Sequence, residues 1–178
     1  DEKAYKGLIN DVITGGVRGI VPCGTTGESA TLSHEEHERV IDITVDEVGK
    51  RVPVIAGTGS NSTTEAIRLT RHAREAGADA ALLITPYYNK SNEEGIYEHF
   101  KYVLDRVDVP CVLYNIPGRT GCSISVDNVR RLGDHPNAWA IKEASGNISY
   151  AASVARYLSD DFRMFSGNDD MVVPILSL

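Results

Sequence analysis

Lys142 is a cation at the end of an otherwise apolar run, residues 138–141, and a turn-like segment, residues 144–146, follows it. A run of this kind is typical of a buried strand in a parallel sheet, where a lysine rarely lies without a partner or a chemical task. Burial disfavours the ammonium form and lowers the pKa of a lysine below about 10.4, which leaves more free amine to attack a carbonyl. Lys142 is therefore a candidate for Schiff-base formation. From position alone, it could equally extend its charge to the rim of the sheet.

Other polar and aromatic residues follow apolar runs of the same kind. They are Gly24, Thr25, Thr26, Gly27 and Glu28; Tyr87 and Tyr88; Tyr114 and Arg119; and Gly167 and Asn168. Each group lies at the carboxyl end of a different predicted strand. Convergence from many strands is how a (β/α) barrel builds its active site, whereas an open sheet concentrates its site at one switch point.

The elements that must position these residues form a repeating pattern. Short apolar runs, each followed by a helical stretch, occur at residues 17–23, 52–56, 80–85, 111–115, 138–142 and 162–165. Alternation of this kind predicts β/α units in a parallel sheet. The runs carry no alternating polar face, so we expect both faces of the sheet to be covered. That leaves a barrel or a doubly wound sheet, and the convergence of polar residues favours the barrel.

Helix boundaries are marked by capping signals. Capping-box patterns occur at Ser33 with Glu36, Ser62 with Glu65 and Ser91 with Glu94, and glycines that suit helix ends are Gly49, Gly77 and Gly133. The serines predict where three helices begin, and the glycines predict where helices end.

Composition excludes several classes of function. Eighteen basic residues against twenty-five acidic ones leave a net charge of −7, which argues against nucleic acid or an anionic membrane as the partner, although a local site can still be positive. No apolar run approaches a membrane span, and we expect no signal peptide. Cys23, Cys111 and Cys122 show no CxxC spacing, which favours a reduced cytoplasmic protein without a structural metal. No dinucleotide or P-loop motif occurs.

Four motifs carry a resemblance to a known family. They are GTTGES at residues 24–29, TPYYNK at 85–90, YNIPGRTG at 114–121 and IKEASG at 141–146. In this order and at these separations they closely resemble the 4-hydroxy-tetrahydrodipicolinate synthase (dihydrodipicolinate synthase) branch of the N-acetylneuraminate lyase family of class I aldolases. The resemblance runs along the whole chain.

The resemblance implies a TIM (β/α)8 barrel. Residues 1–178 would form a single (β/α) barrel domain, incomplete at both ends, that lacks the first strand, the last strand and the C-terminal helical region. An open arc of strands leaves two unpaired edges and an exposed interior, so we expect the whole enzyme to be longer.

The resemblance also implies a reaction. Lys142 would form an imine with pyruvate without any cofactor, and the derived enamine would add to L-aspartate 4-semialdehyde to give 4-hydroxy-tetrahydrodipicolinate in lysine (diaminopimelate) biosynthesis. Tyr114 would relay protons, with Thr25 linking it to Tyr88. Thr26 would bind the pyruvate carboxylate, and Gly167 would also contact substrate.

Purely structural roles for these residues remain open. On the residues alone, Tyr114 could be a core-filling tyrosine, Thr25 and Thr26 an ordinary turn, and Tyr88 a surface aromatic. The resemblance instead implies that Tyr88 enters the site of a neighbouring subunit, in a cytoplasmic homo-oligomer that is a dimer of dimers (a homotetramer).

Arg119 bears on the choice of substrate. A guanidinium can hold the carboxylate of the second substrate through two parallel hydrogen bonds. By resemblance, sialic acid lyases and sugar-acid aldolases generally lack this arginine. The alternatives are a surface salt bridge for Arg119, and another pyruvate-dependent class I aldolase (N-acetylneuraminate lyase or 2-keto-3-deoxy sugar-acid aldolase) for the protein.

A last group of polar residues lies beside the catalytic motifs. It comprises Ser29, Ala30, His34, His37, Asn61, Glu65 and Tyr87. His34 and His37 lie three apart, without the HExxH arrangement or a third ligand, so a zinc hydrolase is not favoured. The group resembles the family's allosteric pocket for L-lysine, which implies L-lysine as an inhibitor. From spacing alone, these residues could simply be solvated helix starts.

Overall fold

The computed structural model describes residues 1–178 as a mixed α/β fold built on one sheet of five parallel strands. The strands are β1 (Ile55–Gly57), β2 (Ala80–Ile84), β3 (Cys111–Asn115), β4 (Ala138–Glu143) and β5 (Arg163–Ser166). They lie side by side in the order in which they occur along the chain. In a doubly wound sheet the order of the strands reverses at a switch point. Here the order follows the sequence throughout, as in an arc of a (β/α) barrel.

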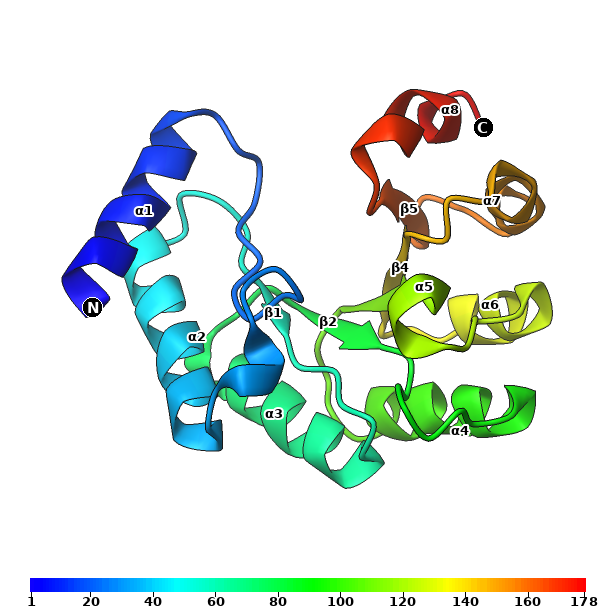
Figure 1. The fold of residues 1–178 in the computed structure, drawn as a ribbon, viewed down its shortest axis with the longest axis horizontal. Helices are drawn as coiled ribbons and strands as arrows, with labels where there is room; N and C mark the ends of the chain where they lie inside the picture. Colours follow the sequence, from blue (N-terminus) through cyan, green and yellow to red (C-terminus); the bar gives the residue numbers. More distant parts are fainter.

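Helices precede, connect and follow the strands, and most of them cover one side of the arc (Figure 1). They are α1 (Glu2–Thr14), α2 (His34–Val48), α3 (Thr63–Ala76), α4 (Glu93–Leu104), α5 (Pro117–Thr120), α6 (Val126–Gly133), α7 (Ile148–Ala155) and α8 (Val172–Leu176), with short 3₁₀ turns η1 (Ser29–Thr31) and η2 (Asp169–Met171). Figure 1 shows α2, α3, α4, α6 and α7 along the outer side of the arc, and α1 and α8 at its two ends. Because all five strands are parallel, their carboxyl ends lie at the same edge of one curved sheet.

The first predicted strand, residues 17–23, is not a strand in the structure. It forms a single parallel bridge, between Ile20 and Val54. Pro22 has no N–H to donate to a ladder, and Cys23 turns the chain with a positive φ of 53°. The segment therefore runs beside β1, where Ile20 and Pro22 share backbone hydrogen bonds with residues 53–57, but it forms only the one bridge and ends in a turn.

The capping signals were partly correct. Ser33 and Glu36 form the complete capping box at the start of α2. Ser62 caps α3 through the Glu65 amide, but the Glu65 carboxylate bonds to other partners instead of closing a box. The box predicted at Ser91 is wrong, because α4 begins one residue later.

The residue that caps α4 is Asn92, whose Oδ1 accepts from the Gly95 amide at 2.8 Å. Glu94, the other member of the predicted box, forms an ion pair with Arg131 at 2.8 Å. The carboxylate therefore pairs with a guanidinium on α6 and does not bond back to a backbone amide at the start of α4.

The glycine signals followed the same mixed pattern. Gly49 and Gly77 end α2 and α3 in the left-handed conformation that glycine adopts without strain. Gly133 is instead the last residue of α6, and Asp134 is its cap. There the glycine allows close packing, since an added Cβ would lie 3.3 Å from the Phe162 ring.

Side chains on the two faces of the sheet form separate clusters. The face toward the helices contributes Leu83, Leu113 and Ile141 to a core of 19 buried residues, which we call the outer core. The opposite face carries the inner cluster, which is Leu82, Val112, Tyr114, Ala140 and Ala144. Because strand residues alternate between faces, each position on β3 and β4 is assigned to one side. No helix in the structure combines the length and the apolar character needed to cross a membrane.

Candidate active site

Lys142 lies on β4, directly opposite Tyr114 on β3 in the parallel register. The Lys142 side chain is half-buried, and its Nζ lies 4.3 Å from the centre of the Tyr114 ring. Burial lowers the pKa of Lys142 below its ordinary value, and no charged neighbour contributes to that shift. The lysine therefore packs against an aromatic ring and reaches no carboxylate that would stabilise its ammonium form.

Gly167, at the end of β5, leaves room beside this lysine. A Cβ added there would lie 3.1 Å from Lys142 Cε and 2.7 Å from the Ala144 Cβ. Its amide also donates to the Glu143 carbonyl at 2.7 Å, which fixes the chain close to β4. A side chain at residue 167 would therefore crowd the amine.

Tyr114 connects the lysine to a cavity of about 280 Å³. Tyr114 is 5% exposed, and the cavity is lined by Cys23, Gly24, Thr25, Glu28, Ser29, Ala30, Gly57, Gly59, Leu82, Ile84, Tyr87, Tyr114, Arg119 and Thr120. The structure thus brings Tyr114, Thr25 and Arg119 together around one space. Thr26, Tyr88, Lys142 and Gly167 do not line it.

The two threonines belong to a tight turn. The Gly27 amide donates to the Gly24 carbonyl at 3.0 Å, and the Glu28 amide donates to the Thr25 carbonyl at 3.1 Å. Glu28 then takes a positive φ of 55° before η1 begins. Both threonine side chains are exposed at this turn, so their hydroxyls are accessible.

Arg119 lies in α5, and its side chain is exposed at the cavity. None of the ion pairs in the structure includes Arg119. The arginines that do pair with carboxylates are elsewhere, on α2, α3 and α6. The structure therefore lacks the surface salt bridge considered as an alternative for Arg119, and Arg119 lines the cavity without an ion-pair partner.

Tyr88 has an unusual backbone and an exposed ring. Its side chain is 90% exposed, and its φ is +72°, a conformation that costs free energy for a residue with a side chain. In the single chain the ring therefore lies outside the cavity that Tyr114 lines.

A second cavity, of about 150 Å³, lies next to the first. Its lining is Ser29, Ala30, Leu32, His34, His37, Gly59, Glu65, Leu69 and Tyr87. Six of the seven residues in the last predicted group therefore surround one space, and Asn61 is the exception. The two cavities share Ser29, Ala30, Gly59 and Tyr87, so they have a common wall.

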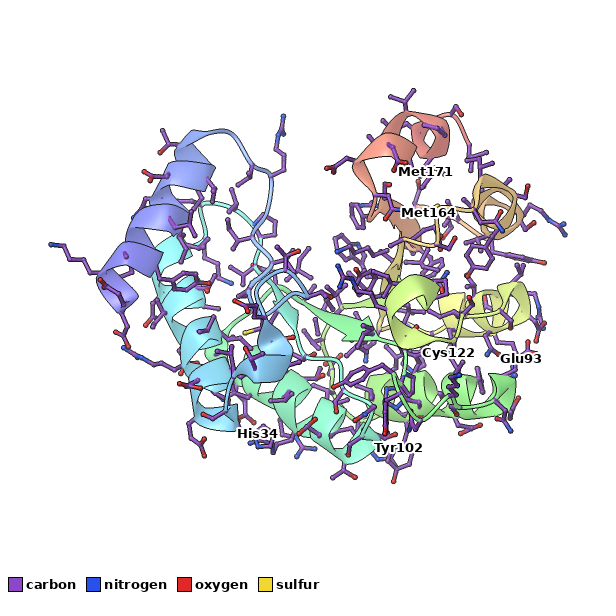
Figure 2. The ribbon with its side chains drawn as sticks, viewed as in Figure 1. His34, Glu93, Tyr102, Cys122, Met164 and Met171 are labelled. Atoms are coloured by element: carbon purple, nitrogen blue, oxygen red, sulfur yellow. The ribbon has the colours of Figure 1, made fainter.

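Glu65 is the charged centre of the second cavity. His34 Nε2 lies 2.6 Å from Glu65 Oε1, and the Ser60 hydroxyl donates to the other oxygen. The hydrogen bonds from Ser60 and from His34 lower the pKa of the Glu65 carboxyl. Figure 2 labels His34 at the start of α2, from which it reaches this carboxylate.

His37 is the buried member of the histidine pair. Its side chain is enclosed, its Nδ1 has no hydrogen-bond partner, and burial lowers its pKa. The two histidines thus occupy different environments, since His34 is exposed and hydrogen-bonded to Glu65. No group of three or more His, Cys, Asp or Glu side chains is placed to hold a metal ion.

Two functional candidates were missed by sequence reasoning. Asn115 and Glu143 follow Tyr114 and Lys142 directly, are 1% and 2% exposed, and form a hydrogen bond of 2.7 Å. The available signal was a carboxylate inside an apolar strand, at the position after the lysine.

A family model described as the dihydrodipicolinate synthetase family matches residues 1–178. The chain belongs to this family. Among relatives in the dihydrodipicolinate synthetase family, a protein from Syntrophus aciditrophicus (strain SB) named 4-hydroxy-tetrahydrodipicolinate synthase is 56% identical over 178 residues. That match covers 100% of this chain and 61% of the relative, so the chain spans about three fifths of the relative's length.

Solved structures of the family have the same fold. Dihydrodipicolinate synthase from Aquifex aeolicus has a TM-score of 0.97 and 45% identity, over 99% of this chain and 61% of that one. The chloride-inhibited enzyme from Acinetobacter baumannii, complexed with pyruvate, has a TM-score of 0.96 and 45% identity, over 99% and 60%. The enzyme from Cyanidioschyzon merolae with lysine bound has a TM-score of 0.96 and 40% identity, over 99% and 60%.

Proposed function

We propose that the protein is a lyase that condenses pyruvate with L-aspartate 4-semialdehyde to 4-hydroxy-tetrahydrodipicolinate in lysine (diaminopimelate) biosynthesis. The observation that carries the proposal is the half-buried Lys142 amine packed on the Tyr114 ring at the carboxyl ends of β3 and β4. A relative named for this activity and a relative's structure with pyruvate bound support it.

The chemistry needs only an amine and proton transfers. The Lys142 amine adds to the ketone carbon of pyruvate, and loss of water gives an imine whose protonated nitrogen withdraws electrons. The pyruvate methyl group then loses a proton, and the resulting enamine carbon bonds to the aldehyde carbon of the second substrate. The amine of that substrate attacks the imine carbon, which closes the ring and releases Lys142. No cofactor enters the balance.

Tyr114 is the proposed proton relay. It is buried beside the lysine and lines the cavity together with Thr25, so a substrate in the cavity could exchange protons with its hydroxyl. We assign the pyruvate carboxylate to Thr26 and the space beside the imine to Gly167. Tyr88 completes the relay by entering a neighbouring subunit of a homo-oligomer, and its 90% exposure supports this.

Arg119 is the proposed determinant of the second substrate. Its unpaired guanidinium at the cavity suits an aldehyde that carries a carboxylate, which polyhydroxylated sugar chains lack at that end. This favours the synthase reaction over the lyases and aldolases that cleave sialic acid or sugar acids.

The second cavity is the proposed binding site for L-lysine as an inhibitor. Glu65 offers a carboxylate to an ammonium group, and His34 and Tyr87 offer polar atoms nearby. A family structure with lysine bound supports this use. Because Ser29, Ala30 and Tyr87 line both cavities, a ligand in one can disturb the other.

Two broader features complete the proposal. We assign the chain to one barrel domain, because its five strands form one sheet with one outer core. We place the enzyme in the cytoplasm, which the free state of Cys23, Cys111 and Cys122 supports.

Borohydride reduction in the presence of pyruvate tests the central step. Mass spectrometry of the intact protein should show one reduced pyruvyl group, on the peptide that contains Lys142. The Lys142→Ala variant should lose the adduct, while Lys101→Ala, which removes an exposed lysine of α4 paired with Asp105, should keep it. Labelling that persists in Lys142→Ala would refute the imine.

A further inference from the structure

Glu143 is a buried carboxylate that the proposed chemistry does not use. It is 2% exposed, yet both of its oxygens accept hydrogen bonds. Oε2 accepts from Asn115 Nδ2 at 2.7 Å, and Oε1 accepts from the Ser145 amide at 2.6 Å. A buried charge is tolerated only when such donors surround it, so these contacts are specific features of the fold.

Asn115 extends the contact to another part of the chain. Its Oδ1 accepts from the Ile124 amide at 3.0 Å, while its own carbonyl accepts from the Ala144 amide at 2.9 Å. The Ile124 carbonyl in turn accepts from the Tyr150 hydroxyl of α7 at 2.6 Å. The side-chain pair therefore joins the ends of β3 and β4 to α7 and to the segment 116–124, which carries Arg119 and is called the Arg119 segment below.

The orientation of every group in this pair is determined by its partners. The Asn115 amide must point its N–H₂ toward the carboxylate and its oxygen toward the Ile124 N–H, because the reverse would oppose donor to donor. Glu143 must accept on both sides, since Ser145 also offers an N–H. The arrangement leaves no choice of rotamer that satisfies all partners equally well.

The pair lies directly behind the candidate catalytic residues. Tyr114 faces Lys142 across β3 and β4, and Asn115 faces Glu143 at the next register position. Alternation places the first pair on the inner face and the second on the face toward the helices. The contact between Asn115 and Glu143 therefore lies on the far side of the two strand ends that carry Tyr114 and Lys142, whose register the backbone ladder fixes.

We propose that Asn115 and Glu143 are positioning residues that hold the Arg119 segment in place relative to Lys142. The inference rests on the proposed function, because it concerns how the carboxylate of the second substrate is presented to the enamine. The pair touches no substrate itself. It acts through the Ile124 amide on one side and the Ser145 turn on the other.

Exchanging the two side-chain types gives a test with an internal rescue. In Glu143→Gln, either Asn115 Nδ2 or the Ser145 amide must face the N–H₂ group of the glutamine. In Asn115→Asp, two carboxylates oppose each other without a proton between them. In the double variant, the introduced glutamine donates its N–H₂ to the introduced aspartate and accepts from the Ser145 amide through its oxygen. The aspartate still accepts from the Ile124 amide, so every partner is again satisfied.

Steady-state kinetics of the intact protein should follow this pattern. Each single variant should lower kcat/KM for L-aspartate 4-semialdehyde by about 30- to 100-fold, whereas borohydride trapping of pyruvate changes by less than about threefold. The double variant should recover to within about fivefold of the parent. A double variant no better than the worse single variant would overturn the proposal.

A matched control separates positioning from general damage. Asn128 is fully buried, and its Nδ2 donates to the Glu93 carbonyl at 2.7 Å between α6 and α4. Asn128→Asp should lower stability without a selective loss for the second substrate. Selective loss in this control equal to that in Asn115→Asp would also overturn the proposal.

Amide hydrogen exchange gives a readout that does not depend on activity. The Ile124 amide donates to residue 115, and the Ser145 amide donates to residue 143. Both amides should therefore exchange faster in each single variant and regain protection in the double variant. Unchanged exchange in the single variants would refute the positioning role. If the parent protein does not trap pyruvate, the proposed function is refuted. The positioning role is refuted separately, by the exchange and rescue results.

Discussion

At the residue scale, the reactivity proposed for Lys142 comes from what surrounds it. Burial lowers the pKa of the amine, and the neighbouring group is the face of the Tyr114 ring. A carboxylate in contact with Nζ would act in the opposite direction, because it stabilises the ammonium form. Glu143, the next residue, turns its carboxylate to the other face of β4, where it accepts hydrogen bonds from Asn115 and Ser145. The strand geometry thereby keeps a nearby negative charge away from the nucleophile.

Arg119 gives the prediction that belongs to this scale. Arg119→Ala should lower kcat/KM for L-aspartate 4-semialdehyde by about 100-fold or more, because a charge-assisted pair of hydrogen bonds to the substrate carboxylate is lost. Trapping of pyruvate on Lys142 should be nearly unchanged. Arg119→Lys keeps the charge without the planar fork and should recover only part of the activity. Equal loss of both steps would indicate a structural role, which the exposed position of Arg119 argues against.

At the element scale, the packing of α4 against α3 contains a buried histidine. His99 of α4 is 5% exposed, and its Nδ1 lies 2.8 Å from the Thr63 hydroxyl of α3. Its Nε2 has no partner, and burial lowers its pKa to about 4 from the ordinary 6.5. Protonation would place a charge between the helices with one ring nitrogen unsatisfied. His99 is therefore expected to be neutral in the folded protein at neutral pH.

This burial predicts a pH-dependent loss of stability. The unfolded chain binds a proton at His99 below pH 6.5, whereas the folded chain does so only below about pH 4. The unfolding free energy should therefore fall as pH decreases from 6.5 to about 4, and the contribution should level off below that. The difference between the two pKa values corresponds to about 3 kcal/mol.

Urea denaturation of the intact protein between pH 4 and 7 measures the effect. His99→Asn does not titrate in this range, so its stability should fall less steeply with decreasing pH than that of the parent protein. His135→Asn is a suitable control, because it also removes an imidazole, but one that is partly exposed and lies 3.2 Å from Asp105. Identical slopes for the parent and His99→Asn would contradict the burial argument.

At the scale of the whole molecule, the arc places two cavities side by side at the same end of the sheet. Their common wall consists of Ser29, Ala30, Gly59 and Tyr87, from η1 and from the segments that follow β1 and β2. Gly59 packs tightly there, since an added Cβ would lie 2.3 Å from the Ile84 nitrogen. A wall with so little free space can transmit a displacement from one cavity to the other.

The prediction at this scale concerns L-lysine. Calorimetry should detect binding to the intact protein at millimolar concentration, with partial inhibition of the synthase reaction. Glu65→Ala should weaken binding by about tenfold or more, because the ligand's ammonium loses its counter-charge. Glu94→Ala removes a glutamate that pairs with Arg131 and does not line the cavity, so it should leave binding unchanged. Absence of heat in the parent protein at these concentrations would leave the second cavity without its proposed ligand.

Much of the fold followed from local pattern. The runs at residues 80–85, 111–115 and 138–142 correspond closely to β2, β3 and β4, because buried strands of a parallel sheet are continuously apolar. The run at 17–23 failed, because a short apolar segment does not reveal whether its backbone can join a ladder. The prediction of Ser91 as a cap was wrong for a related reason, since two neighbouring residues could cap α4; in the structure Asn92 does so, and Glu94 pairs with Arg131 instead of closing a capping box.

The sequence by itself therefore determined the alternation of strands and helices, the family, and the residue types at the strand ends. Each of these depends only on neighbouring residues or on short motifs. Only the tertiary structure decided which of those side chains meet. The absence of a carboxylate partner for Lys142, the bond between His34 and Glu65, and the contact between Asn115 and Glu143 all depend on strand register and helix packing. Those quantities arise from contacts between residues far apart in the chain, which spacing along the sequence does not specify.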